Sequence, residues 1–188
     1  MTTTPSSVID FPMENPSSDV ARAFIDQART FLSREYLPKI ERCLEQLTDE
    51  QIWFRPNDVS NSIGNLVLHL CGNARQWLVT GLGDSPDRRD RDSEFNQRDI
   101  IPRADLLQNL QTTLGDVDVV LANLDPKVLL EERKIQGKNV QVLEAVFHVT
   151  EHFSMHTGQI ILFTKMLAER DLRFYDFSAG EPVNRWHN

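Results

Sequence analysis

The sequence predicts an all-α fold, and specifically a four-helix bundle. Four long stretches carry apolar residues at intervals of three or four positions, which places those residues on one face of a helix. The chain has 188 residues, of which 40% are hydrophobic and 26% are charged, as is typical of a single globular domain. Four helices with one apolar face each bury those faces best against one another, which favours a bundle.

The first helical stretch covers residues 19–47. Pro38 lies inside it and has no backbone N–H to donate, so we expect a kink or a break at that point. Thr48 then begins a short turn in which Gln51 occupies the reciprocal capping position.

The second stretch covers residues 61–80 and ends at Gly81. The side opposite its apolar face is polar but almost uncharged, whereas the outer side of a surface helix normally carries lysine and glutamate. We therefore expect this helix to be enclosed on most sides or to line a wet cavity. A second copy of the chain could also cover this surface, so a homodimer is a further expectation.

Residues 83–99 separate the second and third stretches and contain a run of arginines and aspartates. Surface charge runs usually stay solvated, so we interpret this segment as a solvated loop. The alternative is a lid or an anion clamp built from Arg88, Arg89 and Arg91. The third helical stretch begins at Pro102, a favourable first helical residue, and ends before a second proline.

Residues 134–139 are the one segment for which we predict extended structure, as a small hairpin or turn around Gly137. The fourth helical stretch covers residues 140–170 and is apolar around much of its circumference, as expected of a central helix. The chain is thus divided into a flexible N-terminal arm (1–17), the bundle (18–171) and an irregular C-terminal tail (172–188).

Composition restricts the partners and the location of the protein. The net charge is −8, so the chain lacks the overall basic character of nucleic-acid-binding domains, and we expect no nucleic-acid partner. No apolar stretch reaches the roughly eighteen residues of a membrane span, so we expect no membrane partner. The N-terminus lacks the basic start and apolar core of a secretory signal, and two cysteines suit a reducing compartment. We therefore expect a cytoplasmic protein.

Three histidines on the fourth helical stretch indicate a metal site. His148, His152 and His156 recur every four residues, so neighbouring pairs face the same way, about 6 Å apart along the helix axis. A pair at this spacing can hold one metal ion, but the outer two histidines are about 12 Å apart and cannot easily share it. One pair therefore needs a third ligand from elsewhere, and His69 on the uncharged stripe of the second helix is the natural candidate. Burying several imidazoles costs free energy unless each finds a partner, which favours a shared metal.

A peptidase is one alternative. His148, Glu151 and His152 match the H-x-x-E-H pattern of inverzincins, in which the two histidines bind zinc and the glutamate is the general base. That pattern also needs a downstream carboxylate ligand on a supporting helix, and only two glutamates follow it in this chain. We therefore rank this interpretation low. A carboxylate-rich di-iron site ranks lower, because it needs two Glu-x-x-His motifs and the sequence has none.

The segment from His152 to Gln159 carries a second motif. It reads H-x-x-x-H-x-G-Q, with His152 and His156 followed by Gly158 and Gln159. Together with the upstream helical His69, this pattern resembles the DinB-like superfamily of bacterial metal-binding four-helix proteins, over about residues 19–170.

The resemblance implies a ligand set for one divalent metal ion, zinc or nickel, with an open position filled by water. The ligands carried over are His69, His152 and His156, which leaves His148 outside the triad as a supporting, core or pocket residue. Gln159 is expected to hydrogen-bond near the site, and Gly158 to allow close helix packing.

The expected chemistry follows from three neutral ligands, which leave the ion its full positive charge. Such an ion favours deprotonation of water or of a thiol near neutral pH. The resemblance implies transfer of a low-molecular-weight thiol, as in bacillithiol- and mycothiol-dependent S-transferases, or hydrolysis. We therefore expect a metal-dependent S-transferase or hydrolase acting on small molecules, with no catalytic side chain assigned. A non-catalytic metal-binding or ligand-sensing module is the main alternative.

Overall fold

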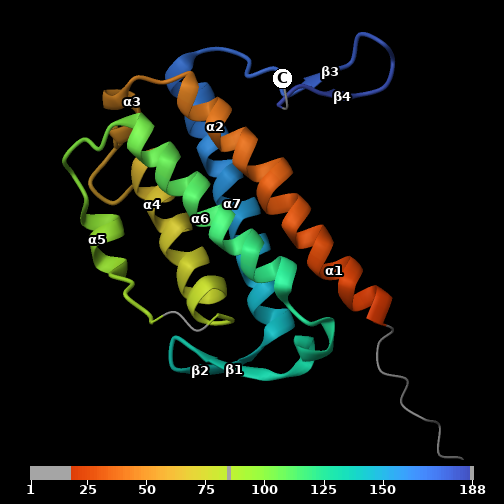
Figure 1. The fold of residues 1–188 in the computed structure, drawn as a ribbon. Coiled ribbons are helices and arrows are strands. Elements are labelled where there is room, and N and C mark those ends of the chain that lie inside the picture. The colour runs from red at the N-terminus through yellow and green to blue at the C-terminus, as the bar shows by residue number, and fades with distance from the viewer. Residues whose placement is uncertain (1–17, 84–85, 187–188) are drawn as a thin grey trace, which may run out of the picture.

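The computed structural model describes residues 18–83 and 86–186, and this part of the chain is mostly helical (Figure 1). The all-α class is therefore confirmed in outline, with two small antiparallel sheets of two strands each beside the helices. The arm predicted for residues 1–17 lies outside the described residues. None of the helices in the described ranges is long and apolar enough to cross a membrane.

The helical elements include two π-helical turns, η1 and η2, and one 3₁₀ turn, η3. In chain order they are α1 (Ser18–Thr30), η1 (Phe31–Tyr36), α2 (Leu37–Glu45), α3 (Asp49–Trp53), α4 (Ile63–Ala74), η2 (Arg75–Thr80), α5 (Arg91–Asn96), α6 (Arg103–Asn123), η3 (Pro126–Leu130) and α7 (Val142–Ala168). The strands are β1 (Glu132–Ile135), β2 (Lys138–Gln141), β3 (Tyr175–Asp176) and β4 (Val183–Asn184).

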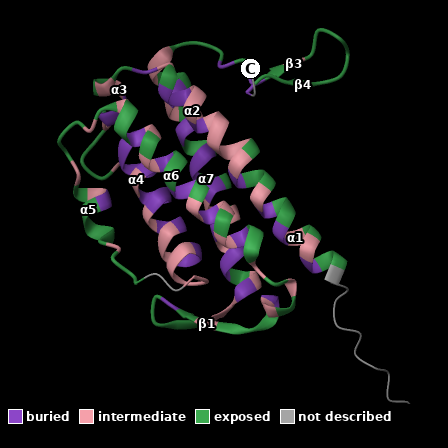
Figure 2. Ribbon diagram, viewed as in Figure 1, coloured by how far each residue is buried: buried purple, intermediate pink, exposed green. Residues whose placement is uncertain are grey.

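The long helices pack around one apolar core, with α4 against α6 and α7, α2 against α7, and α1 against α6. Figure 2 shows buried residues on the faces that these helices turn toward one another. The short helix α3 contacts the first residues of both α4 and α6, and Gln51 on α3 donates a hydrogen bond to the Leu167 carbonyl near the end of α7. Thus α4 and α6 run in the same direction and α7 runs against them (Figure 1).

Pro38 is accommodated without a break in the first helix. It lies at the second position of α2, directly after the π-helical turn η1. Because proline has no N–H, it cannot donate to the Arg34 carbonyl four residues earlier. The indole of Trp186 donates to that carbonyl instead, at 3.1 Å. The expected interruption of the hydrogen-bond ladder is thus present as a π-helical turn.

The same contact qualifies the prediction of an irregular tail. Strands β3 and β4 pair with each other, and Trp186 is buried next to α2, with Lys39 Nζ 4.0 Å from the centre of its ring. Most of the described tail is irregular, as predicted, and the two short strands were not predicted because two residues carry no detectable alternation of apolar and polar positions.

The hairpin around Gly137 is confirmed and is slightly longer than predicted, since β1 pairs with β2 from Glu132 to Gln141. Gln136 and Gly137 both have positive φ angles, 52° and 76°, as the two-residue turn of a twisted hairpin requires. The prediction for residues 83–99 was incomplete, because this segment contains the helix α5.

The enclosure predicted for the second helix is confirmed, because ten of the twelve residues of α4 are buried. It begins with a full capping box between Ser62 and Asn65. Since α3, α5, α6 and α7 already cover α4, it does not offer the free surface on which the expected homodimer was based.

Gly64 lets α3 and α4 come close together, and this provides a test of the packing. A Cβ atom at Gly64 would lie 2.7 Å from the buried ring of Trp53. We expect Gly64→Ala to lower the free energy of unfolding by about 1–3 kcal/mol, since the ring has no room to move. Gly115→Ala is the matched control, because a Cβ there meets nothing within 4 Å, and it should raise stability by up to about 1 kcal/mol. Urea denaturation of both variants measures this, and equal stability of the two would contradict the packing argument.

Candidate metal centre

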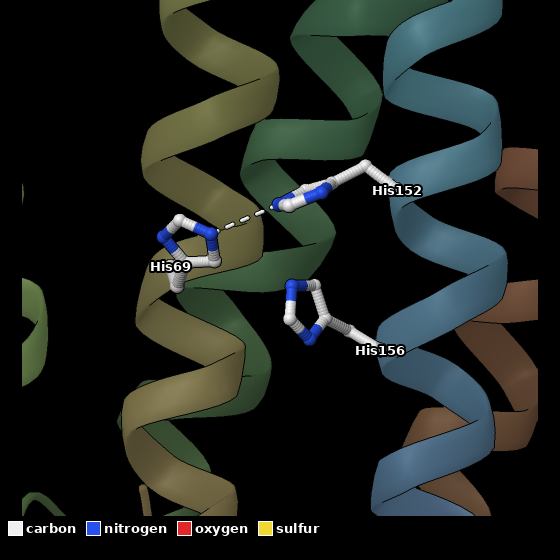
Figure 3. Close-up of side chains that lie close together, drawn as sticks. All are labelled: His69, His152 and His156. Atoms are coloured by element: carbon white, nitrogen blue, oxygen red, sulfur yellow. Dashed lines mark hydrogen bonds between the residues drawn. The ribbon is translucent and has the colours of Figure 1, made fainter.

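Three histidines from two helices converge in the structure. His69 on α4 faces His152 and His156 on α7, and one ring nitrogen from each lies within 4.8 Å of the other two. Figure 3 shows the three rings turned toward a common space between these helices. The structure therefore brings together the triad named from the sequence, across 83 residues of chain between His69 and His152.

The spacing of these nitrogens fits a divalent cation. His69 Nε2 and His152 Nε2 lie 2.9 Å apart, and no pair in the group is farther apart than 4.8 Å. Imidazole nitrogens bind zinc at about 2.0–2.1 Å, so two ligands of a tetrahedral ion are about 3.4 Å apart. The pair at 2.9 Å is slightly closer than that value and the whole group stays within 4.8 Å, so small side-chain adjustments suffice to hold an ion.

His69 is held in the orientation that a metal ligand needs. Its Nδ1 lies 2.9 Å from Glu94 Oε2 on α5, and both side chains are almost fully buried. A proton on Nδ1 donates to the carboxylate, which leaves the lone pair of Nε2 directed at His152 and His156. Arg89 Nη2 also lies 3.1 Å from His69 Nδ1, but a guanidinium only donates, so the carboxylate is the partner of the imidazole N–H.

Glu94 itself is held by a buried bidentate ion pair. Arg89 Nε donates to Oε1 at 2.7 Å and Arg89 Nη2 donates to Oε2 at 2.9 Å, with the two side chains only 4% and 8% exposed. Burial alone would raise the pKa of Glu94, but the hydrogen bonds from Arg89 and His69 outweigh it and hold that pKa below its usual value. Gly72 makes room for the carboxylate, because a Cβ at that position would collide with Glu94.

This ion pair corrects the prediction of a solvated loop. Arg89 and Glu94 are buried against α4, whereas Arg88 and Arg91 are exposed. The anion clamp is not formed either, because Arg89 is already bound to Glu94 and to Gln76 Oε1. The sequence analysis missed Glu94, and its one usable signal was Phe95, an apolar residue within the charged run, whose ring packs 4.6 Å from that of His69.

The surroundings of the other two histidines favour the neutral form that binds metals. Burial and the neighbouring imidazoles of His156, His69 and His148 lower the pKa of His152 to about 3. Burial likewise lowers the pKa of His156, whose Nδ1 donates to Gln159 Oε1 at 2.7 Å. Gln159 therefore lies where the motif placed it, and it leaves Nε2 of His156 free for the shared space.

His148 lies outside the triad, one helical turn before His152. Asn73 Nδ2 donates to its Nε2 at 3.2 Å, and the ring of Trp77 packs 4.1 Å from its ring. The stripe of polar residues on α4 thus continues past His69 to a second contact with α7.

A protein-family model described as "Protein of unknown function (DUF1572)" matches residues 19–181. The chain belongs to the DUF1572 family. The matched range includes the triad, Arg89 and Glu94, so the whole candidate site lies within the family region. A comparison with curated proteins found no match.

The geometry of this DUF1572 chain does not favour the H-x-x-E-H interpretation. His152 groups with His69 and His156, whereas His148 is not part of the cluster of nitrogens within 4.8 Å. Glu151, the general base in that interpretation, is exposed on α7.

The two cysteines are not poised as nucleophiles. Cys43 and Cys71 are buried thiols, and burial raises their pKa values to about 11 and about 12. The expectation that Gly158 allows close packing is wrong within the described chain, because a Cβ there would meet nothing within 4 Å.

The ion pair predicts that Glu94 tunes metal binding without touching the metal. Glu94→Gln removes the charge that orients His69, so we expect divalent metal affinity to fall about 10- to 100-fold. Gly72→Ala should act in the same direction by displacing the carboxylate. The control is Glu151→Gln, an exposed carboxylate one residue from His152, which should leave affinity unchanged. Competition of each folded variant with a coloured zinc chelator measures these affinities, and equal affinity of Glu94→Gln and wild type would contradict the proposed role of Glu94.

Proposed function

We propose that this DUF1572 protein is a metal-dependent enzyme of the DinB-like four-helix type that holds one divalent ion through His69, His152 and His156. The observation that carries the proposal is the convergence of three imidazoles on one space, two of them with the second ring nitrogen already bonded. Imidazole ligands suit zinc or nickel.

When bound, a divalent ion with three neutral ligands supplies the positive charge that favours deprotonation of a thiol or of water. The side chains of this protein hold the ligands in place for that chemistry. Glu94 fixes the protonated nitrogen of His69, and Gln159 does the same for His156. The ring of Phe95 packs on that of His69, with 4.6 Å between the ring centres.

The reaction that we favour is transfer of a low-molecular-weight thiol to an electrophilic small molecule. It rests on the resemblance of the H-x-x-x-H-x-G-Q segment to the DinB-like superfamily, some of whose members are thiol S-transferases. Hydrolysis by activated water is the second candidate, because the same neutral ligand set supports both nucleophiles.

A non-catalytic role is favoured by a different observation. His69 and His156 are only 6% and 9% exposed and belong to two core helices, so an ion between them would tie α4 to α7. Such a protein would gain thermal stability from the metal and would turn over no substrate.

Metal analysis of variants tests the proposal directly. We expect the wild type to hold one ion per chain after reconstitution, and His69→Ala, His152→Ala and His156→Ala to lose it, because each removes one of three ligands. His148→Ala is the control and should keep the ion. Elemental analysis of the folded proteins gives these stoichiometries.

Two outcomes would redirect the interpretation. Loss of the ion in His148→Ala with retention in His156→Ala would revive the peptidase. A wild type that stays metal-free after reconstitution would remove the enzyme proposal altogether. Where the ion is held, a screen of thiol transfer and of hydrolysis separates the enzyme from the non-catalytic module.

A further inference from the structure

A second polar cluster adjoins the histidine triad. On α4 and η2, residues 69, 73 and 77 recur every four positions, and on α7 residues 148, 152 and 156 do the same in the opposite direction. Asn73 and Trp77 therefore meet His148 one helical turn away from the triad, at the contacts of 3.2 Å and 4.1 Å described above. Trp77 belongs to the π-helical turn η2, and such turns are frequent at functional sites.

Two polar atoms of this cluster lack partners. Among the described residues, Asn73 Oδ1 and Trp77 Nε1 are both buried without a hydrogen bond, and their side chains belong to residues only 4% and 9% exposed. Leaving such atoms unpaired is costly, so native proteins rarely do it without a reason. Trp53 gives the comparison, because it is equally buried and its Nε1 donates to the Ile101 carbonyl at 2.9 Å.

The unpaired atoms define the chemistry of a ligand. Trp77 Nε1 offers a donor and Asn73 Oδ1 offers an acceptor, and both side chains contact the ring of His148. A carboxylate would face the lone pairs of Asn73, and an ammonium group would face the N–H of Trp77. A carboxamide carries one acceptor and two donors, so it satisfies both atoms without bringing a charge into a buried site.

We propose that Asn73, Trp77 and His148 form a subsite that binds an uncharged carboxamide group of the substrate, beside the metal-binding histidines. This inference rests on the proposed function and adds a substrate class to it, namely small molecules that bear an amide next to the reacting group.

The first test compares two tryptophans in the free protein. Trp77→Phe removes an unpaired donor and should leave Tm unchanged, whereas Trp53→Phe removes a bonded donor and should lower Tm by several degrees. Equal losses of Tm would show that the Trp77 N–H is already bonded, by water or by protein, and would overturn the subsite.

The second test measures ligand binding at the subsite and does not require catalysis. In protein labelled with ¹⁵N, acetamide should shift the indole signal of Trp77 and leave those of Trp53 and Trp186 in place, while acetate should shift none of them. Asn73→Leu should weaken the response to acetamide at least tenfold, a factor that one lost hydrogen bond in a buried site accounts for. Equal responses to acetate and acetamide, or no response of Trp77 to acetamide, would overturn the proposal.

Measuring the metal content of the same samples distinguishes the carboxamide subsite from the proposed metal-dependent enzyme. A protein that responds to acetamide but holds no metal keeps the subsite and refutes the enzyme proposal. A protein that holds the metal but shows no response to acetamide refutes the subsite and keeps the enzyme proposal.

Discussion

The buried ion pair between Arg89 and Glu94 is the interaction on which the candidate site depends. Two charges with less than a tenth of their side-chain surface exposed repay their desolvation only through close, bidentate contact, and this pair has it. Removing one partner would leave the other charged and buried, at a cost of about 3–5 kcal/mol. The pair therefore fixes the segment before α6 against Gly72 of α4, and through Glu94 it also fixes the ring of His69.

The helix topology explains why Arg89 and Glu94, which belong to a charged connecting segment, come to be buried. Helices α4 and α6 run in the same direction, so the chain between them must travel back along their full length (Figure 1). The returning segment lies over α4, and its helix α5 packs on α4 beside His69. Its acidic and basic residues thus form one wall of the site, while the remaining charges stay at the surface.

Periodicity was enough to predict the long helices and the histidine stripe on α7, because both depend on spacing within a single helix. The choice of His69, His152 and His156 as one set came from the resemblance of the H-x-x-x-H-x-G-Q segment to the DinB-like superfamily. Three features were not accessible in that way. The burial of Arg89 and Glu94 depends on contacts with α4, and their neighbours Arg88 and Arg91 look the same in the sequence but are exposed. The contact of Trp186 with the carbonyl of Arg34, to which Pro38 cannot donate, joins residues far apart in the sequence. The open space at Gly158 depends on what surrounds the helix.

The ion pair between Arg89 and Glu94 also determines how much of its positive charge a bound metal ion would keep. A lone carboxylate behind His69 would pull the imidazole toward its anionic form and so neutralise part of the metal charge. Arg89 opposes this effect, because its guanidinium shares both oxygens of Glu94 and makes the pair neutral as a whole. His69 would then serve as a well-oriented ligand beside His152 and His156. An ion held by three imidazoles would be the strongest attraction for a negatively charged nucleophile in this part of the protein, and on this physical basis we propose thiol or water activation rather than a purely structural metal.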